Sequence, residues 1–244
     1  MRKPKQAAGN WLPALLLLLG CPLSLEAQSA SSSWPPLVSG EKLTFNLIWP
    51  SGISLGEATL TAARAGAEIH LEASVVADLP QYHAGYTFTS VADDRLCSLR
   101  FRETLREGRN TRETLYEFDQ TKHTVRRTKN GQTTENAVPD CARDPLALLY
   151  HFRQQLASRQ VPIGTAEATG AFYLGEDYVA RYEAVTPEAV KLGSKSWEGD
   201  RFMIRVQGSD GERSFEIWIR PEPSRAPVAV RVQFSLGTLS AELQ

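Results

Sequence analysis

The sequence predicts a mainly β fold: a curved, largely antiparallel sheet of about a dozen strands, an incomplete or closed β-barrel, wrapped around one main α-helix. Three observations predict this class. Segments that alternate apolar and polar residues recur at a spacing of about 8–12 residues. Turn residues such as Gly, Asn and Asp separate these segments. Asp144–Ser158 is the one stretch after the N-terminal segment with clear helical periodicity.

The expected strands follow the alternating segments in order. Gly56 lies inside the second of them and indicates a β-bulge or a close backbone approach. Asn130-Gly131 predicts a two-residue hairpin turn after a short strand at Val125. The full set of expected strands is 42–49, 53–64, 69–75, one that starts at Tyr86, 99–105, 116–118, the strand at Val125, 168–174, 178–185, 202–206, 215–219, 228–234 and 238–243.

The helix is predicted from its ends and its apolar stripe. Asp144 can accept hydrogen bonds from free N–H groups of the first turn, and Pro145 fits the first helical position. The apolar stripe consists of Leu146, Leu149, Tyr150 and Leu156, and polar cover is expected from Arg153, Gln154, Gln155 and Arg159. Two interpretations stay open: an ordinary core helix, or a helix that lines a ligand cavity.

Residues 1–27 have the pattern of a signal peptide, with a basic start, the apolar run Leu12–Leu19 and a cleavage site after Ala27. Residues 28–37 then form a flexible lead, and residues 38–244 a single β domain, which we expect in the periplasm. Gly20-Cys21 offers an alternative, because a small residue before Cys is typical of a bacterial lipoprotein. Lipidation at Cys21 would add a peripheral membrane association.

Charge and cysteine content fit an exported protein. Cleavage after Ala27 would remove three of the 27 basic and one of the 28 acidic residues, which leaves a net charge of −3. Such a balance gives no reason to expect nucleic acid as a partner. Cys97 and Cys141 would remain, and an even pair in an oxidising compartment predicts a disulfide. Two buried free thiols are the alternative.

A local excess of positive charge lies between Arg95 and Lys129, with ten basic and five acidic residues. Its members include Arg100, Arg102, Arg106, Arg126 and Arg127. One hypothesis is a surface for an anionic partner in the envelope. The other is a solvated outer face with ion pairs between neighbouring strands.

Several short motifs occur in an order that resembles the bacterial exported family known as domain of unknown function 3108. They are Gly40-Glu41-Lys42-Leu43, Leu55-Gly56-Glu57-Ala58-Thr59-Leu60, Asp144-Pro145-Leu146, Ile217-Trp218-Ile219, Arg225-Ala226-Pro227-Val228 and Gly237-Thr238-Leu239 with Glu242-Leu243. The resemblance spans about residues 38–244. It implies an envelope protein with a curved antiparallel β fold, and it assigns no catalytic residue. The two cysteines are not part of the family pattern.

The sequence contains no recognisable catalytic motif. His70, His83, His123 and His151 lack the spacing of metal ligands, so we assign no metal or cofactor. No GxSxG nucleophile elbow joins a strand to a helix, HExxH does not occur, and no glycine-rich phosphate loop opens a helix. The carboxylate pairs Asp93-Asp94 and Glu176-Asp177 occupy turn positions. No catalytic residue is therefore assigned.

We expect a non-enzymatic envelope protein that binds a lipid or another apolar or amphipathic molecule between sheet and helix. The candidate cavity-lining residues are Leu146, Leu149, Tyr150, Trp49 and Trp218. The alternative is a packed scaffold that meets an envelope protein partner through the basic strands. A hydrolase with a site dispersed over several strands is the third hypothesis.

Overall fold

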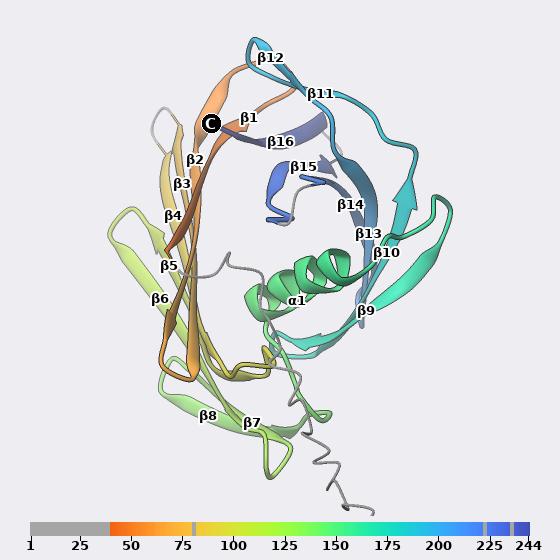
Figure 1. Ribbon diagram of the computed structural model, residues 1–244. Coiled ribbons are helices and arrows are strands. Elements are labelled where there is room, and N and C mark those ends of the chain that lie inside the picture. The colour runs from red at the N-terminus through yellow and green to blue at the C-terminus, as the bar shows by residue number, and fades with distance from the viewer. Residues whose placement is uncertain (1–39, 80–81, 222–223, 235–236) are drawn as a thin grey trace, which may run out of the picture. The chain divides into compact units, whose positions relative to one another are not determined.

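The computed structural model describes residues 40–79, 82–221, 224–234 and 237–244, and these contain sixteen strands and one helix (Figure 1). The predicted signal peptide, the flexible lead and Cys21 lie outside the described residues. The elements are β1 (Glu41–Ile48), β2 (Ser54–Ala65), β3 (Glu68–Leu79), β4 (Tyr82–Ala92), β5 (Ser98–Glu107), β6 (Asn110–Asp119), β7 (Thr124–Lys129), β8 (Gln132–Ala137), α1 (Pro145–Ser158), β9 (Ala166–Tyr173), β10 (Asp177–Val185), β11 (Val190–Leu192), β12 (Lys195–Trp197), β13 (Asp200–Gly208), β14 (Gly211–Ile219), β15 (Pro227–Phe234) and β16 (Gly237–Leu243).

Fourteen of these strands form one antiparallel sheet, so the predicted fold class is confirmed. The strand order is β8-β7-β6-β5-β4-β3-β2-β1-β16-β15-β14-β13-β10-β9. The first eight strands form one meander, and β1 joins it to the second meander by pairing with the last strand, β16. α1 follows the edge strand β8 and precedes the opposite edge strand β9. The short hairpin β11–β12 forms a second sheet, which the sequence pattern did not predict.

The two edges of the sheet approach each other without a continuous ladder. Arg143, just before α1, makes an isolated bridge to Phe172 of β9. The Asn136 side chain in β8 donates a hydrogen bond of 2.8 Å to the hydroxyl of Tyr173 in β9. The sheet is therefore strongly curved but not strictly closed.

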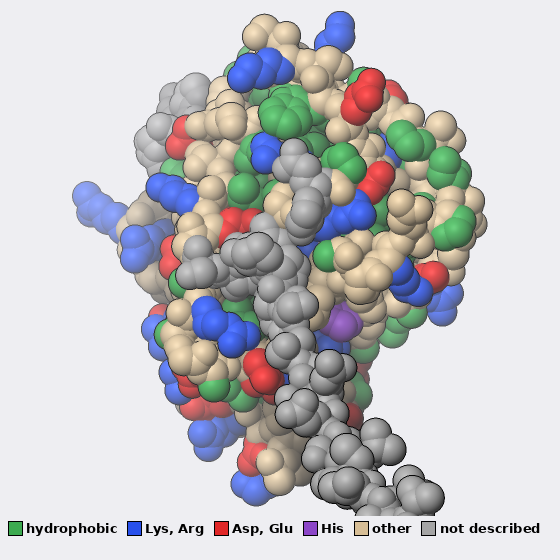
Figure 2. Space-filling view, viewed as in Figure 1, with side chains coloured by type: hydrophobic (Ala, Val, Ile, Leu, Met, Phe, Trp, Pro, Cys, Tyr) green, Lys and Arg blue, Asp and Glu red, His purple; other side chains and the backbone are tan. Residues whose placement is uncertain are grey.

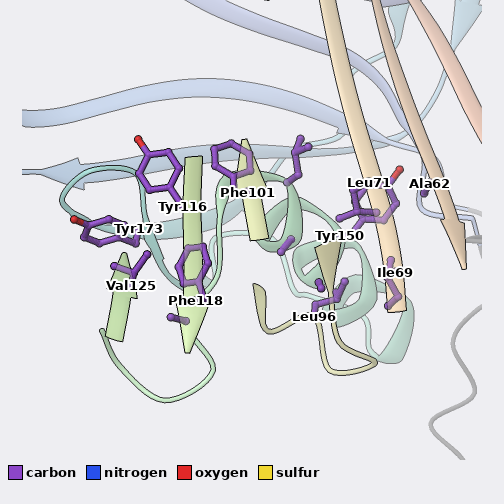
Figure 3. Packing of buried hydrophobic residues seen from close by; sticks show 14 of the residues in the cluster. Ala62, Ile69, Leu71, Leu96, Phe101, Tyr116, Phe118, Val125, Tyr150 and Tyr173 are labelled. Carbon is purple, nitrogen blue, oxygen red and sulfur yellow. The ribbon is translucent and has the colours of Figure 1, made fainter. Parts of the chain in front are cut away.

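α1 packs against the inner face of both meanders. One buried cluster joins Tyr150 and Leu146 of α1 to strands of the first meander, where Phe101 and Tyr116 are almost fully buried (Figure 3). A second cluster joins Phe152 and Leu156 to β10, β13 and β14. A third cluster lies on the outer face of β14 and β15, where the hairpin β11–β12 contributes Val190 and Leu192 around Trp218.

Two turn and bulge signals in the sequence are confirmed. Asn130 and Gly131 join β7 to β8 with positive φ angles of 51° and 76°, as a primed hairpin turn requires. At Gly56 the β1–β2 register shifts, φ is 143°, and a Cβ atom would lie 1.9 Å from the carbonyl oxygen of Val76. Only glycine allows the backbone of β3 to come this close.

The start of α1 is fixed by the side chain of its N-cap residue, Asp144. One carboxylate oxygen accepts hydrogen bonds from the N–H groups of Leu146 and Ala147, at 2.8 and 3.0 Å. The other accepts from the hydroxyls of Ser90 in β4 and Ser98 in β5, both at 2.6 Å. Burial is the largest influence on the Asp144 carboxyl and raises its pKa. These four hydrogen bonds lower the pKa and offset only part of that effect. The N-cap therefore also ties the helix to the first meander.

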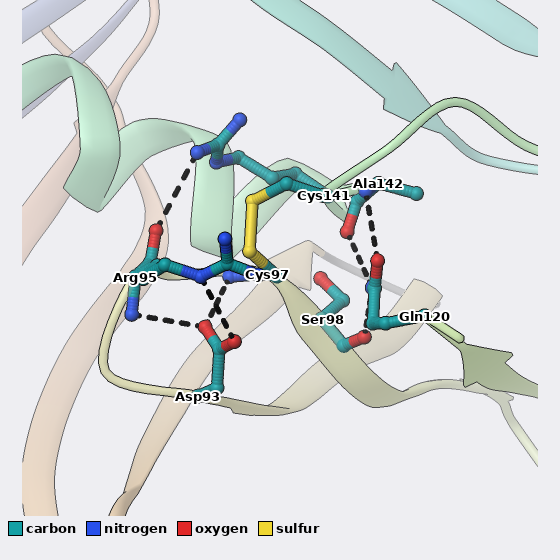
Figure 4. A network of polar contacts seen from close by, with 8 residues as sticks. Asp93, Arg95, Cys97, Ser98, Gln120, Cys141 and Ala142 are labelled. Carbon is teal, nitrogen blue, oxygen red and sulfur yellow. Dashed lines mark hydrogen bonds and ion pairs between the residues drawn. A yellow bond between two sulfur atoms is a disulfide. The ribbon is translucent and has the colours of Figure 1, made fainter. Parts of the chain in front are cut away.

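A disulfide between Cys97 and Cys141 lies close to this N-cap (Figure 4). Beside it, the Gln120 amide nitrogen donates to the carbonyl oxygens of Ser98 and Ala142, at 2.6 and 3.0 Å. The Ser98 N–H also donates to Ala142 O at 2.9 Å. The predicted disulfide therefore joins the start of β5 to the segment that leads into the helix.

We predict that replacing both cysteines by alanine lowers the free energy of unfolding by about 2–5 kcal/mol, because the bridge closes a long loop in the unfolded chain. Urea titration of the oxidised protein and the Cys97→Ala/Cys141→Ala variant measures the difference. Reductant should shift the midpoint of the wild-type protein and leave that of the double variant unchanged. An equal response of both proteins would show that the bridge does not form.

Candidate functional site

A cavity of about 200 Å³ lies between α1 and the inner face of the second meander. α1 lines one side and strands β9, β10, β13 and β14 line the other. Among the lining residues, Thr169 supplies the one polar side chain. The lining residues are Pro145, Leu148, Leu149, Phe152, Thr169, Phe172, Ala180, Ile204, Val206, Phe215 and Ile217.

The local backbone of β9 allows the helix to approach this wall. Gly170 has a φ of 146° and sits where the pairing of β9 with β10 shifts register. A Cβ atom at Gly170 would lie 3.3 Å from a methyl carbon of Leu148, which is tighter than usual packing. The glycine therefore sets how closely Leu148 can pack against the wall.

The predicted cavity-lining residues lie in four different places. Leu149 lines the cavity. Leu146 and Tyr150 face the first meander and belong to its buried cluster. Trp49 follows the end of β1 and is half-buried. Trp218 lies on the opposite, outer face of the sheet, where its indole N–H donates to Glu188 O at 3.1 Å.

The position of Trp218 corrects the sequence interpretation. Alternation within β14 gives Ile217 to the cavity and Trp218 to the outer face. Two arginines cover the indole ring, with the Arg201 and Arg231 guanidinium carbons 5.3 and 4.7 Å from its centroid. The prediction failed because both faces of β14 are covered, so hydrophobicity alone does not identify the inner face.

A buried ion pair sets the orientation of α1. The guanidinium of Arg153 donates to both carboxylate oxygens of Glu41 in β1, at 2.8 and 2.6 Å, and the two side chains are 4% and 8% exposed. Arg153 also donates to the carbonyl oxygens of Ser224 and Arg225, both at 3.0 Å. The contacts thus join α1, β1 and the loop between β14 and β15.

Tyr150 completes this network. Its hydroxyl donates to Glu41 at 2.8 Å, and the Arg153 guanidinium carbon lies 4.6 Å from the centroid of its ring. Burial is the main cause that raises the pKa of the Tyr150 hydroxyl, so the group donates as a neutral phenol. The sequence interpretation of Arg153 as polar cover was wrong, because the residue is among the most buried on the helix.

The five arginines of the predicted basic surface do not share one face. Arg100, Arg102, Arg106 and Arg126 lie on the outer face, where cross-strand neighbours include acids. The register places Glu117 opposite both Arg100 and Arg126, and Glu117 accepts from Arg126 at 2.9 Å. Basic and acidic side chains are interspersed on the visible face of the molecule (Figure 2). Acidic neighbours therefore offset part of the positive charge of these strands.

Arg127 faces the interior, because neighbouring residues of a strand point to opposite faces. Its guanidinium carbon lies 5.9 Å from the centroid of the Tyr116 ring. Tyr116 in turn donates to Glu103 at 3.0 Å, and burial raises the pKa of that carboxyl. Arg127 is therefore separated from the other four arginines by the sheet itself.

A second hollow, of about 330 Å³, lies at the end of the sheet near the C-terminus of α1. Arg159, Arg201 and Arg225 line it. Each is paired with carboxylates: Arg159 with Glu167, Arg201 with Glu188 and Glu216, and Arg225 with Asp200. These pairs occupy the guanidinium groups, so the apolar cavity is the stronger candidate site.

The residues that the structure describes contain neither a metal-binding cluster nor a membrane-spanning helix. No cluster of three or more His, Cys, Asp or Glu side chains there could hold a metal ion. Across the same part of the chain, no helix is long and apolar enough to span a bilayer.

We predict that Arg153→Met lowers the free energy of unfolding by about 3–5 kcal/mol, because it leaves the Glu41 carboxylate buried without its partner. Chemical denaturation of the purified variant measures the loss. Combining Arg153→Met with Glu41→Leu should recover much of it. The matched control is Arg126→Met, which breaks an exposed pair and should cost at most about 1 kcal/mol. Equal losses for both single variants would contradict the assignment.

His151 provides a prediction about pH. Burial, followed by the positive charge of Arg143, lowers the pKa of His151 to about 4. The unfolded chain binds a proton near pH 6.5 and the folded chain does not, so stability contributed by neutral His151 is lost as pH falls from about 6.5 to 4. We expect His151→Phe to flatten this part of the stability curve, measured by urea titration at several pH values. A wild-type curve parallel to that of the variant below pH 6.5 would refute this.

Comparison with known proteins agrees with this architecture. A family model described as a protein of unknown function, DUF3108, matches residues 42–244. No curated protein gave a significant match. The crystal structure of a β-barrel-like protein of domain of unknown function DUF1849 from Brucella abortus is similar, with a TM-score of 0.58 and 9% sequence identity over 85% of this chain and 96% of that chain. This likeness concerns the fold.

A second crystal structure, of a Bacteroides fragilis protein described as exported and of YmcC-like fold, aligns with 10% identity over 84% of this chain and 94% of that one. Its TM-score of 0.30 is too low to support an argument. The family match carries more weight, because residues 42–244 include α1 and all of the sheet except the first residue of β1. The chain belongs to the DUF3108 family.

Proposed function

We propose that this chain is an exported, non-enzymatic protein of the cell envelope that holds the apolar part of a lipid or another amphipathic molecule between α1 and the second meander. The observation that carries the proposal is the apolar cavity of about 200 Å³. Leu149 and Phe152 of the helix face it from one side, and Ile204 and Ile217 from the other.

The size of the cavity suggests how much of a ligand would enter. Engineered apolar cavities of about 150 Å³ accept benzene, whereas pockets for whole drug-sized ligands span about 300–1,000 Å³. A cavity of about 200 Å³ therefore suits one small apolar group, such as the end of a single acyl chain. The polar part of such a ligand would remain outside.

The chemistry of the walls favours an apolar occupant over water. A buried water molecule needs about two to four polar partners, and Thr169 is the one polar side chain among the lining residues. An apolar group would gain dispersion contacts that the walls lack when the space is empty. The walls therefore favour burial of hydrocarbon.

Export is supported by two features of the chain. The N-terminal 27 residues have the pattern of a signal peptide. The disulfide between Cys97 and Cys141 is of the kind that forms and persists in oxidising compartments. A lipid-binding role fits this location, because the periplasm lies between two membranes.

We predict that Ala180→Phe weakens binding of a fluorescent fatty acid by about tenfold or more, because the new ring occupies the cavity. Ala180 is 3% exposed and lines the cavity. Fluorescence titration of the purified protein measures the affinity, and native mass spectrometry with solvent extraction identifies molecules that copurify.

The matched control is Val179→Phe, because Val179 is the preceding residue of β10, 42% exposed on the outer face. It should leave the affinity unchanged. If Ala180→Phe does not fold, Ile204→Ala provides a second test, since it enlarges the cavity and should favour bulkier apolar probes. A protein that purifies empty, together with equal probe affinities for the variants and the wild type, would contradict the proposal.

A further inference from the structure

Large exposed apolar side chains gather at one end of the sheet. Five such residues occur in the described part of the chain: Ile53, Val76, Tyr86, Ile163 and Val179. The first three lie at the end of the sheet where β2 begins, β3 ends and β4 begins. Ile53 is 61% exposed, Val76 54% and Tyr86 37%.

The strand register places Val76 and Tyr86 in neighbouring strands near this end of the sheet. Val76 lies opposite Glu57 in β2, and the preceding residue of β3 lies opposite Tyr86 in β4. Ile53 is the last residue of the turn before β2. Val76 points to the outer face, whereas Tyr86 points to the inner face, on the side of the buried cluster against which Phe88 packs. Apolar side chains are thus exposed on both faces and at the tip.

The β1–β2 hairpin has a defined turn at this tip. The Trp49 N–H donates to Ile53 O at 2.9 Å, and the Gly52 N–H donates to Trp49 O at 2.8 Å. These bonds hold the backbone of Trp49 beside that of Ile53. The indole of Trp49 is half-buried. Amphipathic rings of this kind are favoured at the boundary between lipid and water.

The hairpin is also uncharged over a long stretch. Residues 43–56 contain no Asp, Glu, Lys or Arg, although such residues make up 23% of the chain. The next residue, Glu57, accepts a hydrogen bond of 3.0 Å from Gln244 on the outer face. Asp78 and His83 occur in the neighbouring β3–β4 hairpin, so the uncharged contact surface is that of β1–β2. The carboxylate of Glu57 limits how deeply the β1–β2 hairpin could enter an apolar medium.

We propose that the tip of the β1–β2 hairpin, with Trp49 and Ile53, inserts shallowly into the surface of a lipid bilayer. In the adjoining strands β3 and β4, Val76 and Tyr86 are exposed on opposite faces of the sheet. A rigid protein surface would cover one face, whereas a fluid bilayer can meet apolar groups on both. The absence of basic residues from residues 43–56 makes the contact hydrophobic rather than electrostatic. The contact is independent of whether the cavity beside α1 is occupied.

Sedimentation with phosphatidylcholine vesicles, with and without phosphatidylglycerol, tests the proposal on the purified protein. The wild type should bind both kinds of vesicle, and added salt should have little effect. Ile53→Asp should lower the bound fraction by about tenfold or more, because a carboxylate is costly to insert into lipid.

The matched control is Ile163→Asp. Ile163 is 62% exposed, and its loop lies at the opposite end of the strands, where the following Gly164 N–H bonds to Ala184 O near the end of β10. This variant should bind vesicles like the wild type. Ala180→Phe should also bind them normally, so a failure of cavity binding can be told from a failure of membrane contact.

Three outcomes would overturn the proposal. One is equal binding by Ile53→Asp and Ile163→Asp. Another is binding that requires phosphatidylglycerol and disappears with salt. The third is a wild-type dimer in solution that Ile53→Asp dissociates while neither protein binds vesicles, which would assign the tip to a second copy of the chain. Circular dichroism melts of both variants establish that the fold is intact.

Discussion

The position of the helix inside the sheet depends on the ion pair between Arg153 and Glu41. Two charges are removed from water there, and that arrangement is stable because every side of the guanidinium has a partner. The partners come from the first strand, the helix and the loop before β15, which are remote in sequence. A nonpolar contact at the same place would allow the helix to slide or rotate, whereas a two-pronged hydrogen-bonded pair permits one register. The pair is therefore a constraint on geometry more than a source of net stability.

The opposite end of the helix is held by different chemistry. The Asp144 carboxylate accepts hydrogen bonds from N–H groups of the first helical turn and from two serine hydroxyls. The nearby disulfide joins the start of β5 covalently to the segment before α1. With both ends fixed, α1 cannot collapse onto the second meander to fill the space beside Ile204 and Ile217. A cavity persists in a protein interior when its walls cannot relax into it. The polar anchors thus account for a hollow that packing alone would tend to remove.

Sequence reasoning succeeded where a local rule determines the structure. Asp144-Pro145 marks a helix start, Asn130-Gly131 a hairpin, and a glycine inside a strand, Gly56, a close backbone approach, and each of these signals is carried by one or two residues. Sequence reasoning failed where a contact with a residue distant in sequence determines whether a side chain is buried and which face it occupies. From sequence alone, Arg153 is interpreted as a surface residue, because its buried partner Glu41 is more than a hundred residues away. Trp218 is likewise interpreted as a cavity residue, because the sequence does not show that the hairpin β11–β12 covers the outer face of β14. The cavity itself depends on the curvature of the sheet, which alternation does not encode.

The pairing of β1 with β16 has a consequence for how the protein matures. The first strand of the sheet finds one of its two neighbours only in the last strand of the chain. Until that segment arrives, β1 presents unpaired N–H and C=O groups along an open edge, and such edges invite association with other chains. Contacts so far apart in sequence also form slowly. A chain synthesised from its N-terminus would thus keep this edge open, and remain prone to association, until β16 has been made and has paired with β1.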